Sequence, residues 1–237
     1  MAHYAMDDTR DFTDASRGLI AELPGAVLAD ADGSVVFDPH DFDFIDDRES
    51  APDSVDPSLW RQSRLITRGG LFKVAEGLYQ VRNNDIADLT IVEGTDGLIA
   101  IDCMAGVESA RQGMALIREH VSDKPVVAVI YTHTHIDHYG GVKGVVDEAD
   151  VASGKVPIIA PGHQFDKYAI GENVVAGNAM TRRASYAFGS HLPHDPRGLI
   201  SCGIGVASTK GPAVSYISPT DLVTETGQRR EIAGIEF

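Results

Sequence analysis

The hydrophobic pattern separates a polar first 60 residues from a strand-rich remainder. After residue 70, the runs LFKVAEGLYQVR, ADLTIVEG and GLIAIDC are apolar and β-branched. Gly77, Gly94 and Gly97 interrupt these runs at the positions expected for turns. The pattern therefore predicts a set of consecutive β-strands between residues 70 and 103.

A helix and a buried strand follow these predicted strands. The segment GVESARQGMALIREHV places Ala110, Met114, Ile117 and Val121 at helical spacing. Directly afterwards, KPVVAVIYTH is almost continuously hydrophobic, which is typical of a strand covered on both faces. Further on, VPIIAPGH predicts a short strand, NVVAGNAMTRRASYAF a helix, and AVSYISPTDLV to IAGIEF a return to strands and turns. This order favours an α/β sandwich.

The first 60 residues predict smaller elements around an acidic stretch. The expected elements are a helix over Asp11–Leu23, a hairpin of Val27–Ala29 and Val35–Phe37 turning at Asp32-Gly33, an irregular acidic surface segment, and a helix from Pro57 to Ile66. We therefore predict an acidic N-terminal segment over residues 1–60 and an α/β domain over 61–237.

Charge narrows the classes of partner. The net charge is -15, and residues 1–60 hold 15 acidic and 3 basic side chains against 20 and 17 in the remainder. Such an acidic chain repels phosphate backbones, so we expect no nucleic-acid partner. The only two cysteines, Cys103 and Cys202, predict no disulfide framework and are expected to be small buried residues.

Targeting signals are not visible in the sequence. The N-terminus MAHYAMDDTRDF lacks a basic region followed by an apolar one, so it does not resemble a signal peptide. No apolar run approaches the roughly 20 residues that a membrane span requires. We expect a cytoplasmic protein without a membrane span; export through a leader preceding residue 1 is the alternative.

The segment YTHTHIDHYGG, directly after the buried strand, carries the candidate chemistry. His133 and His135 alternate in an extended chain and so point to one side, about 6.5–7 Å apart. Asp137 and His138 are adjacent and can serve a second metal if the chain turns, which the glycines that follow permit. Three imidazoles and a carboxylate suit Zn²⁺, and Fe²⁺ or Mn²⁺ less specifically. Buried and unpaired, they would cost several kcal/mol, so the spacing indicates a metal site.

This H-x-H-x-D-H pattern resembles the signature of the metallo-β-lactamase superfamily. The wider segments GLYQVRNNDIADLTIVEGTDGLIAIDCM, THTHIDHYGGVKG and ENVVAGNAMTRRASYAFG resemble its alkyl sulfatases, and RGLIAELP resembles their N-terminal region. The resemblance implies an αββα sandwich that hydrolyses alkyl sulfate esters to an alcohol and inorganic sulfate. It also implies two zinc ions per complete site, with His133 and His135 on one and Asp137 and His138 on the other. Asp137 would in addition orient the attacking hydroxide.

In that family the remaining ligands, two glutamates and a histidine, and an arginine-containing sulfate-binding segment come later than Phe237. A helical dimerisation domain and a sterol-carrier-like domain follow them. We therefore expect an N-terminal fragment of a longer alkyl sulfatase or a truncated gene product. Its sandwich would be incomplete at the C-terminus, its activity alone impaired or absent, and a homodimer expected only for the full-length parent.

Other interpretations of the same residues stay open. The chain could be another hydrolase of this fold, such as a thioesterase or lactonase, or a remnant that binds one metal weakly without catalysis. The histidines His163, His191 and His194 could complete a site, although we favour surface or supporting positions for them. Arg182 and Arg183 could attract sulfate or equally lie on the outer face of a helix.

Overall fold

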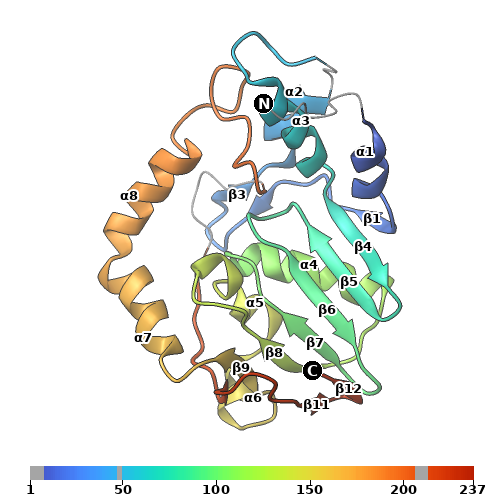
Figure 1. Ribbon diagram of the computed structural model, residues 1–237, viewed down its shortest axis with the longest axis vertical. Coiled ribbons are helices and arrows are strands. Elements are labelled where there is room, and N and C mark those ends of the chain that lie inside the picture. Colours follow the sequence, from blue (N-terminus) through green and yellow to red (C-terminus); the bar gives the residue numbers. More distant parts are fainter. Residues whose placement is uncertain (1–7, 47–49, 206–212) are drawn as a thin grey trace.

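The computed structural model describes residues 8–46, 50–205 and 213–237. Its centre is an eight-stranded mixed sheet with the strand order β1-β4-β5-β6-β7-β8-β9-β10 (Figure 1). The strands are β1 (Leu19–Glu22), β4 (Gly70–Ala75), β5 (Leu78–Arg82), β6 (Leu89–Glu93), β7 (Leu98–Ile101), β8 (Val126–Ile130), β9 (Ile158–Pro161) and β10 (Asp221–Val223). Neighbouring strands from β1 to β7 pair antiparallel. From β7 to β10 they pair parallel, so β7 belongs to both halves of the sheet.

The parallel half of the sheet positions the candidate ligands. Helix α4 (Val107–His120) connects β7 to β8, and the short helices α5 (Val142–Val145) and α6 (Glu148–Ala152) lie between β8 and β9. Since neighbouring parallel strands end at the same edge of a sheet, the residues that follow β7, β8 and β9 lie near one another. The H-x-H-x-D-H segment follows β8 at this edge.

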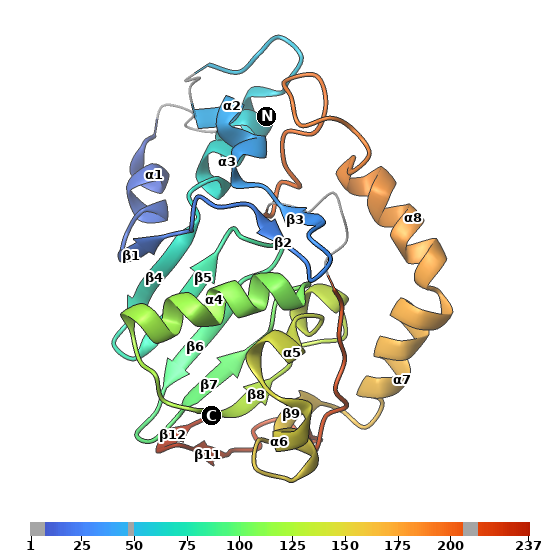
Figure 2. The same cartoon turned by 180° about the vertical axis from the view of Figure 1, so that it is seen from behind.

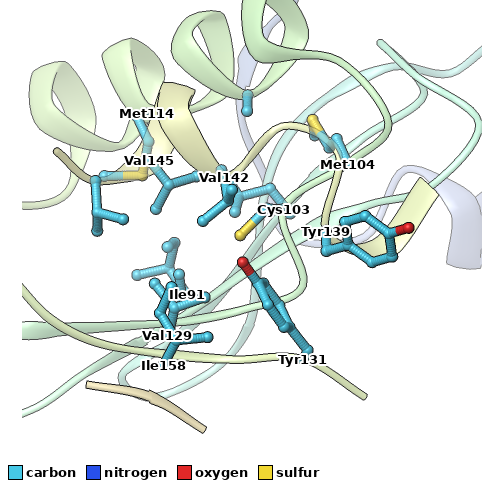
Figure 3. Close-up of a cluster of buried hydrophobic side chains, with 14 of the residues drawn as sticks. Ile91, Cys103, Met104, Met114, Val129, Tyr131, Tyr139, Val142, Val145 and Ile158 are labelled. Atoms are coloured by element: carbon cyan, nitrogen blue, oxygen red, sulfur yellow. The ribbon is translucent and has the colours of Figure 1, made fainter. Parts of the chain in front are cut away.

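Helix α4 covers one face of the sheet, as Figure 2 shows from behind. The side chains on this face alternate along the strands and form the main core with α4 and α5. Figure 3 shows part of this core, in which Cys103 and Met104 lie among Tyr131, Val142 and Met114. Cys103 is fully buried, as predicted, whereas Cys202 is half-buried.

Of the helices that the structure describes, none stands in front of the opposite face of the sheet in Figure 1. Among the described residues, the other paired strands form only two-stranded ribbons, β2 (Leu28–Ala29) with β3 (Val35–Phe37) and β11 (Glu231–Ile232) with β12 (Ile235–Glu236). The described residues thus contain one sheet and one covering helical layer of the expected four-layer sandwich. The α/β class and the strand-helix order agree with the prediction.

The N-terminal segment contains one wrong prediction. The expected helix over Asp11–Leu23 is only α1 (Arg10–Ala15), and Leu19–Glu22 form β1, an edge strand paired with β4. The amphipathic spacing of Leu19 and Leu23 suits a strand of this length as well as a helix, and pairing with β4 decides between them. Gly18 has a φ of +75°, which turns the chain between the two elements.

Two of the other N-terminal predictions are confirmed, whereas the expected irregular surface segment contains short helices and the buried side chains of Phe42 and Ile45. The β2–β3 hairpin turns at Gly33, which has a φ of +80°, and α3 spans Pro57–Ile66 with Pro57 in its first turn. A short helix η1 (Pro39–Phe42) and α2 (Asp43–Asp46) lie between them. A small separate core holds this region together through Phe37, Phe42, Ile45, Trp60 and Ile200. The domain division at residue 60 stays a prediction.

A helical arm runs along one side of the molecule in both ribbon views. It consists of α7 (Phe165–Ile170), the π-helical turn η3 (Gly171–Val175) and α8 (Gly177–Phe188). No residue of η3 or α8 is buried, and Val175 and Tyr186 are about four-fifths exposed, at 82% and 80%. None of the helices in the described ranges has the length and apolar character that crossing a membrane requires.

Candidate metal centre

The four predicted ligands lie together beyond the end of β8. His133 and His135 occupy the loop after the strand, and Asp137 and His138 belong to the 3-10 turn η2 (Ile136–His138). The His133 ring centroid lies 4.7 Å from that of His135 and 4.1 Å from that of His138. The predicted turn between the two pairs is therefore present and brings three imidazoles into contact.

Two glycines fix this turn against the strand next to β8. A Cβ atom on Gly141 would lie 2.1 Å from the carbonyl oxygen of Cys103, and one on Gly140 would lie 2.3 Å from that of Ala105. The Cys103 amide donates to the carbonyl oxygen of His138 at 2.8 Å, and the Gly141 amide donates to that of Met104 at 3.0 Å. The ligand turn is thus held by backbone contact with the residues that follow β7.

Asp102, which sequence analysis did not identify, organises the site from behind. It is buried, and its carboxylate accepts hydrogen bonds at 2.8 Å from the Thr132 amide, the Thr132 hydroxyl and Nδ1 of His138. Its φ is +57°, a left-handed conformation that aspartate tolerates better than most residues. The available signal was its place at the end of β7, next to the strand that carries the ligands.

These contacts determine which nitrogen each imidazole presents. A carboxylate only accepts, so Nδ1 of His138 donates to Asp102 and leaves Nε2 for a ligand role. The Thr132 hydroxyl donates to Asp102, so Nδ1 of His133 must donate to that hydroxyl at 3.0 Å. His133 therefore also presents Nε2, as a metal-binding imidazole held by a second hydrogen bond does.

The pKa values of three of the four candidate ligands are shifted in different directions. Burial and the neighbouring His138 and His135 lower the pKa of His133, which favours its neutral form. Burial alone would lower the pKa of His138, but the hydrogen bonds to Asp102 and Asp137 outweigh it and raise the pKa to about 10. Burial would raise the pKa of Asp137, and its hydrogen bond with His138 reverses this and lowers the pKa.

The donor set suits a divalent cation, although the described residues do not enclose one. Asp137 Oδ2 lies 3.2 Å from His138 Nε2, and a cation can replace the proton between these two groups. Within residues 8–46, 50–205 and 213–237, no three His, Cys, Asp or Glu side chains come together in a geometry that holds a metal ion. The loop supplies four donors, fewer than two four-coordinate zinc ions require.

The helical arm contacts the ligand loop from the side. Glu172 Oε1 lies 4.0 Å from Nε2 of His135. Asn173 Nδ2 donates to the Tyr139 hydroxyl at 2.8 Å and to the Ala169 carbonyl at 3.0 Å, and lies 3.4 Å from the Thr134 carbonyl. The segment NVVAGN was expected as part of a helix, and ENVVAGN as part of the resemblance to alkyl sulfatases. The contact of Glu172 and Asn173 with the candidate ligand loop was not predicted.

Two hollows flank the ligand loop. One, of about 400 Å³, is lined by His133, Thr134 and His163 together with Phe165 and Tyr168 of the arm. The other, of about 360 Å³, is lined by Asp137 and His138 on one side and by side chains of β5, β6 and β7 on the other. A molecule bound at the ligands would therefore contact either the arm or the open sheet face.

The remaining candidate histidines and arginines do not belong to the cluster of four candidate ligands. The surface interpretation is wrong for His194, whose side chain is 10% exposed, pairs with Asp41 through Nδ1 at 2.9 Å and stacks against Phe42. His191 and Arg182 line a hollow on α8, where Arg182 and Arg183 are exposed. Of the downstream histidines in the described ranges, His163 lines a hollow with His133.

Comparison with known proteins gives one consistent result. The family model of the metallo-beta-lactamase superfamily matches residues 83–219. The chain is 49% identical over 98% of its length to a linear primary-alkylsulfatase of Pseudomonas sp, and 45% identical over 97% to the alkyl/aryl-sulfatase BDS1 of Saccharomyces cerevisiae. These alignments cover 34% and 35% of the relatives, so the chain spans about a third of their length.

Solved structures agree with these relatives. The stereoselective inverting sec-alkylsulfatase Pisa1 from Pseudomonas sp. superposes with a TM-score of 0.91 at 40% identity, over 97% of this chain and 36% of that one. The resemblance stated from the H-x-H-x-D-H motif and its flanking segments is confirmed. The chain belongs to the metallo-beta-lactamase superfamily, and the relatives that match nearly its whole length are alkylsulfatases.

Proposed function

We propose that this chain carries part of the active site for zinc-dependent hydrolysis of alkyl sulfate esters to an alcohol and inorganic sulfate. The grouping of three imidazoles and one carboxylate at the end of β8, backed by Asp102, is the observation that supports it. The substrate class is taken from the names of the relatives that align with nearly the whole of this chain. The cytoplasmic location, and a homodimer of a longer parent, stay predictions.

The residues divide by role. His133, through Nε2, and His135 would hold one zinc ion, and Asp137 with His138 would hold the other. Bound zinc would supply a hydroxide nucleophile by lowering the pKa of its water. Asp102 fixes the ring of His138 with Nε2 toward the ligand side, and Thr132 does the same for His133. Asp137 would orient the attacking water as well as ligate.

A second candidate is a chain that binds metal without turnover. It is favoured by the same shortage of ligands, since no three suitable side chains in the described ranges form a metal-holding group. The number of zinc ions bound per chain distinguishes the two candidates. Catalysis by a zinc pair requires two per chain, whereas the second candidate requires at most one.

The test combines zinc analysis with a sulfate assay. The chain is loaded with zinc, its metal content is measured, and sulfate release from dodecyl sulfate is followed. We expect His133→Ala to lose zinc and any sulfate release, while His191→Ala, an exposed matched control on the arm side, retains both. Undiminished sulfate release by His133→Ala would reject the proposal. Zinc binding without release would favour the second candidate.

A further inference from the structure

A row of side chains crosses the sheet on the face opposite α4. The strand register aligns Phe72, Gln80, Thr90, Ile101, Ile130 and Ile159 from β4 to β9. Leu89 and Ile91, on either side of Thr90 in β6, belong to the core beneath α4, so Thr90 faces the opposite way. Gln80 and Thr90 are thus a polar pair within an otherwise apolar row.

The polar pair belongs to a hydrogen-bond chain with a fixed direction. Arg82 Nε donates to Gln80 Oε1 at 3.0 Å, and Gln80 Nε2 donates to Thr90 Oγ1 at 3.0 Å. Because a guanidinium only donates, it determines which way the Gln80 amide points. Arg82 is itself placed by stacking, with its Cζ 4.6 Å from the Phe72 ring centroid. The amide nitrogen must therefore face Thr90.

The chain ends in a donor that is not used within the described part of the protein. The Thr90 oxygen is occupied as an acceptor, which leaves its hydrogen to donate, and no described residue accepts it. Thr90 and Gln80 line the same hollow of about 360 Å³ as Asp137 and His138. The hydroxyl hydrogen can therefore reach an acceptor bound beside these two proposed ligands.

We propose that Thr90 is a substrate-binding residue whose hydroxyl donates to a sulfate oxygen of the ester, with Gln80 and Arg82 as positioning residues. This inference rests on the proposed function. Asp88, Asp102 and Asp137 line the same hollow, and their negative charges would oppose an anion. A fixed donor relayed from a guanidinium offsets part of that repulsion and favours the sulfate ester over the uncharged alcohol product.

The test measures binding separately from hydrolysis. Zinc-loaded protein is titrated calorimetrically with octyl sulfate and with 1-octanol, while sulfate release is recorded in its own assay. Thr90→Val removes the hydroxyl at nearly constant shape, and Thr90→Ser retains it. The matched control is Val92→Thr. Val92 is half-buried on the same face of β6 as Thr90, but it lies two residues farther along the strand, away from the candidate ligands. Circular dichroism and zinc content show whether each variant is folded and loaded.

We expect Thr90→Val to weaken octyl sulfate binding about tenfold, as the loss of one hydrogen bond to a charged acceptor does, with octanol binding unchanged. Thr90→Ser should bind within about twofold of the parent, and Val92→Thr should match it. Equal losses for octyl sulfate and octanol, no change in Thr90→Val, or no octyl sulfate binding by the parent would each overturn the inference. Parent protein that binds octyl sulfate with this pattern but releases no sulfate would reject the proposed function alone.

Discussion

Asp102 accepts a hydrogen bond from Nδ1 of His138 at 2.8 Å, across 36 positions in the sequence. The pair joins the end of β7 to the turn after β8, and it leaves Nε2 of His138 as the nitrogen available to the proposed metal. Since Asp102 also accepts two hydrogen bonds from Thr132, one buried carboxylate positions both sides of the ligand loop. Its influence on metal binding can be measured without removing any proposed ligand.

Asp102→Asn should weaken zinc binding about 10- to 100-fold, the usual effect of losing a partner that orients a ligand. Asparagine tolerates the left-handed backbone at this position, so the fold should be retained. Zinc affinity is measured by competition with a chromophoric chelator. Asp96→Asn, at the exposed turn before β7, is the control and should bind zinc like the parent. Equal zinc affinity of both variants would show that Asp102 does not orient His138.

Much of this centre was predictable because its signal is local. His133, His135, Asp137 and His138 lie within six residues at the end of a hydrophobic strand, so periodicity and ligand chemistry predict them together as candidate ligands. Asp102 lies 31 residues before His133, and its only local signal is its place at the end of a predicted strand. Its role depends on β7 and β8 being parallel neighbours, a long-range pairing that periodicity does not specify.

The fold shows the same distinction. Turn residues and hydrophobic spacing were enough to predict the hairpin at Gly33, helix α4 and the strands from β4 to β9. Leu19–Glu22 became an edge strand because β4 offers a pairing partner about 50 positions away, against a helical pattern that fits only locally. The contact of Asn173 with Tyr139 is likewise a consequence of packing between distant segments.

Gly141→Ala should destabilise the protein by about 2–3 kcal/mol, because the added methyl group would meet the Cys103 and Gly106 carbonyl oxygens at 2.1 and 2.5 Å. The cost arises from moving the ligand turn away from the residues after β7. Chemical denaturation measures the free energy of unfolding. Gly177→Ala in α8 meets no atom within 4 Å and should be neutral or stabilising by up to about 1 kcal/mol. Similar stability of the two variants would contradict the packing argument.

Asp85 provides a pH-dependent prediction outside the ligand cluster. It is buried, and desolvation raises its pKa to about 6, although amide hydrogens of Ile86 and Gly106 donate to it. A carboxyl group whose folded pKa exceeds its unfolded value of about 3.9 destabilises the fold when ionised. Its penalty is therefore fully present above pH 6 and is lost as the pH falls toward 4.

Asp85→Asn should remove this dependence. Relative to the variant, the parent protein should gain about 2 kcal/mol in free energy of unfolding between pH 7 and pH 4. The comparison uses the difference between the two proteins, so other titrating groups cancel. Urea denaturation at several pH values provides the measurement. If the difference in free energy of unfolding between the two proteins did not change with pH, Asp85 would have an ordinary pKa in the folded protein.

His194→Ala should lower stability by about 2 kcal/mol without changing zinc content. The substitution removes a largely buried ring, 10% exposed, that stacks on Phe42 with centroids 4.8 Å apart, and it leaves Asp41 without its imidazole partner. His191→Ala, three residues earlier and exposed, should change stability by less than about 0.5 kcal/mol. Loss of zinc in His194→Ala with unchanged stability would instead assign this histidine to the metal site.

Asn173→Ala should loosen the arm from the ligand loop. The Asn173 side chain donates to the Tyr139 hydroxyl and the Ala169 carbonyl, so its removal breaks the bond that joins η3 to the residue after His138. Hydrogen exchange of the amides in 171–188 should accelerate several-fold, while amides of β8 in the main core should keep their protection. Asn178→Ala, exposed in α8, is the control and should leave both regions unchanged. Equal acceleration in β8 would indicate general destabilisation, and unchanged exchange in the arm would mean that other contacts hold it against the loop.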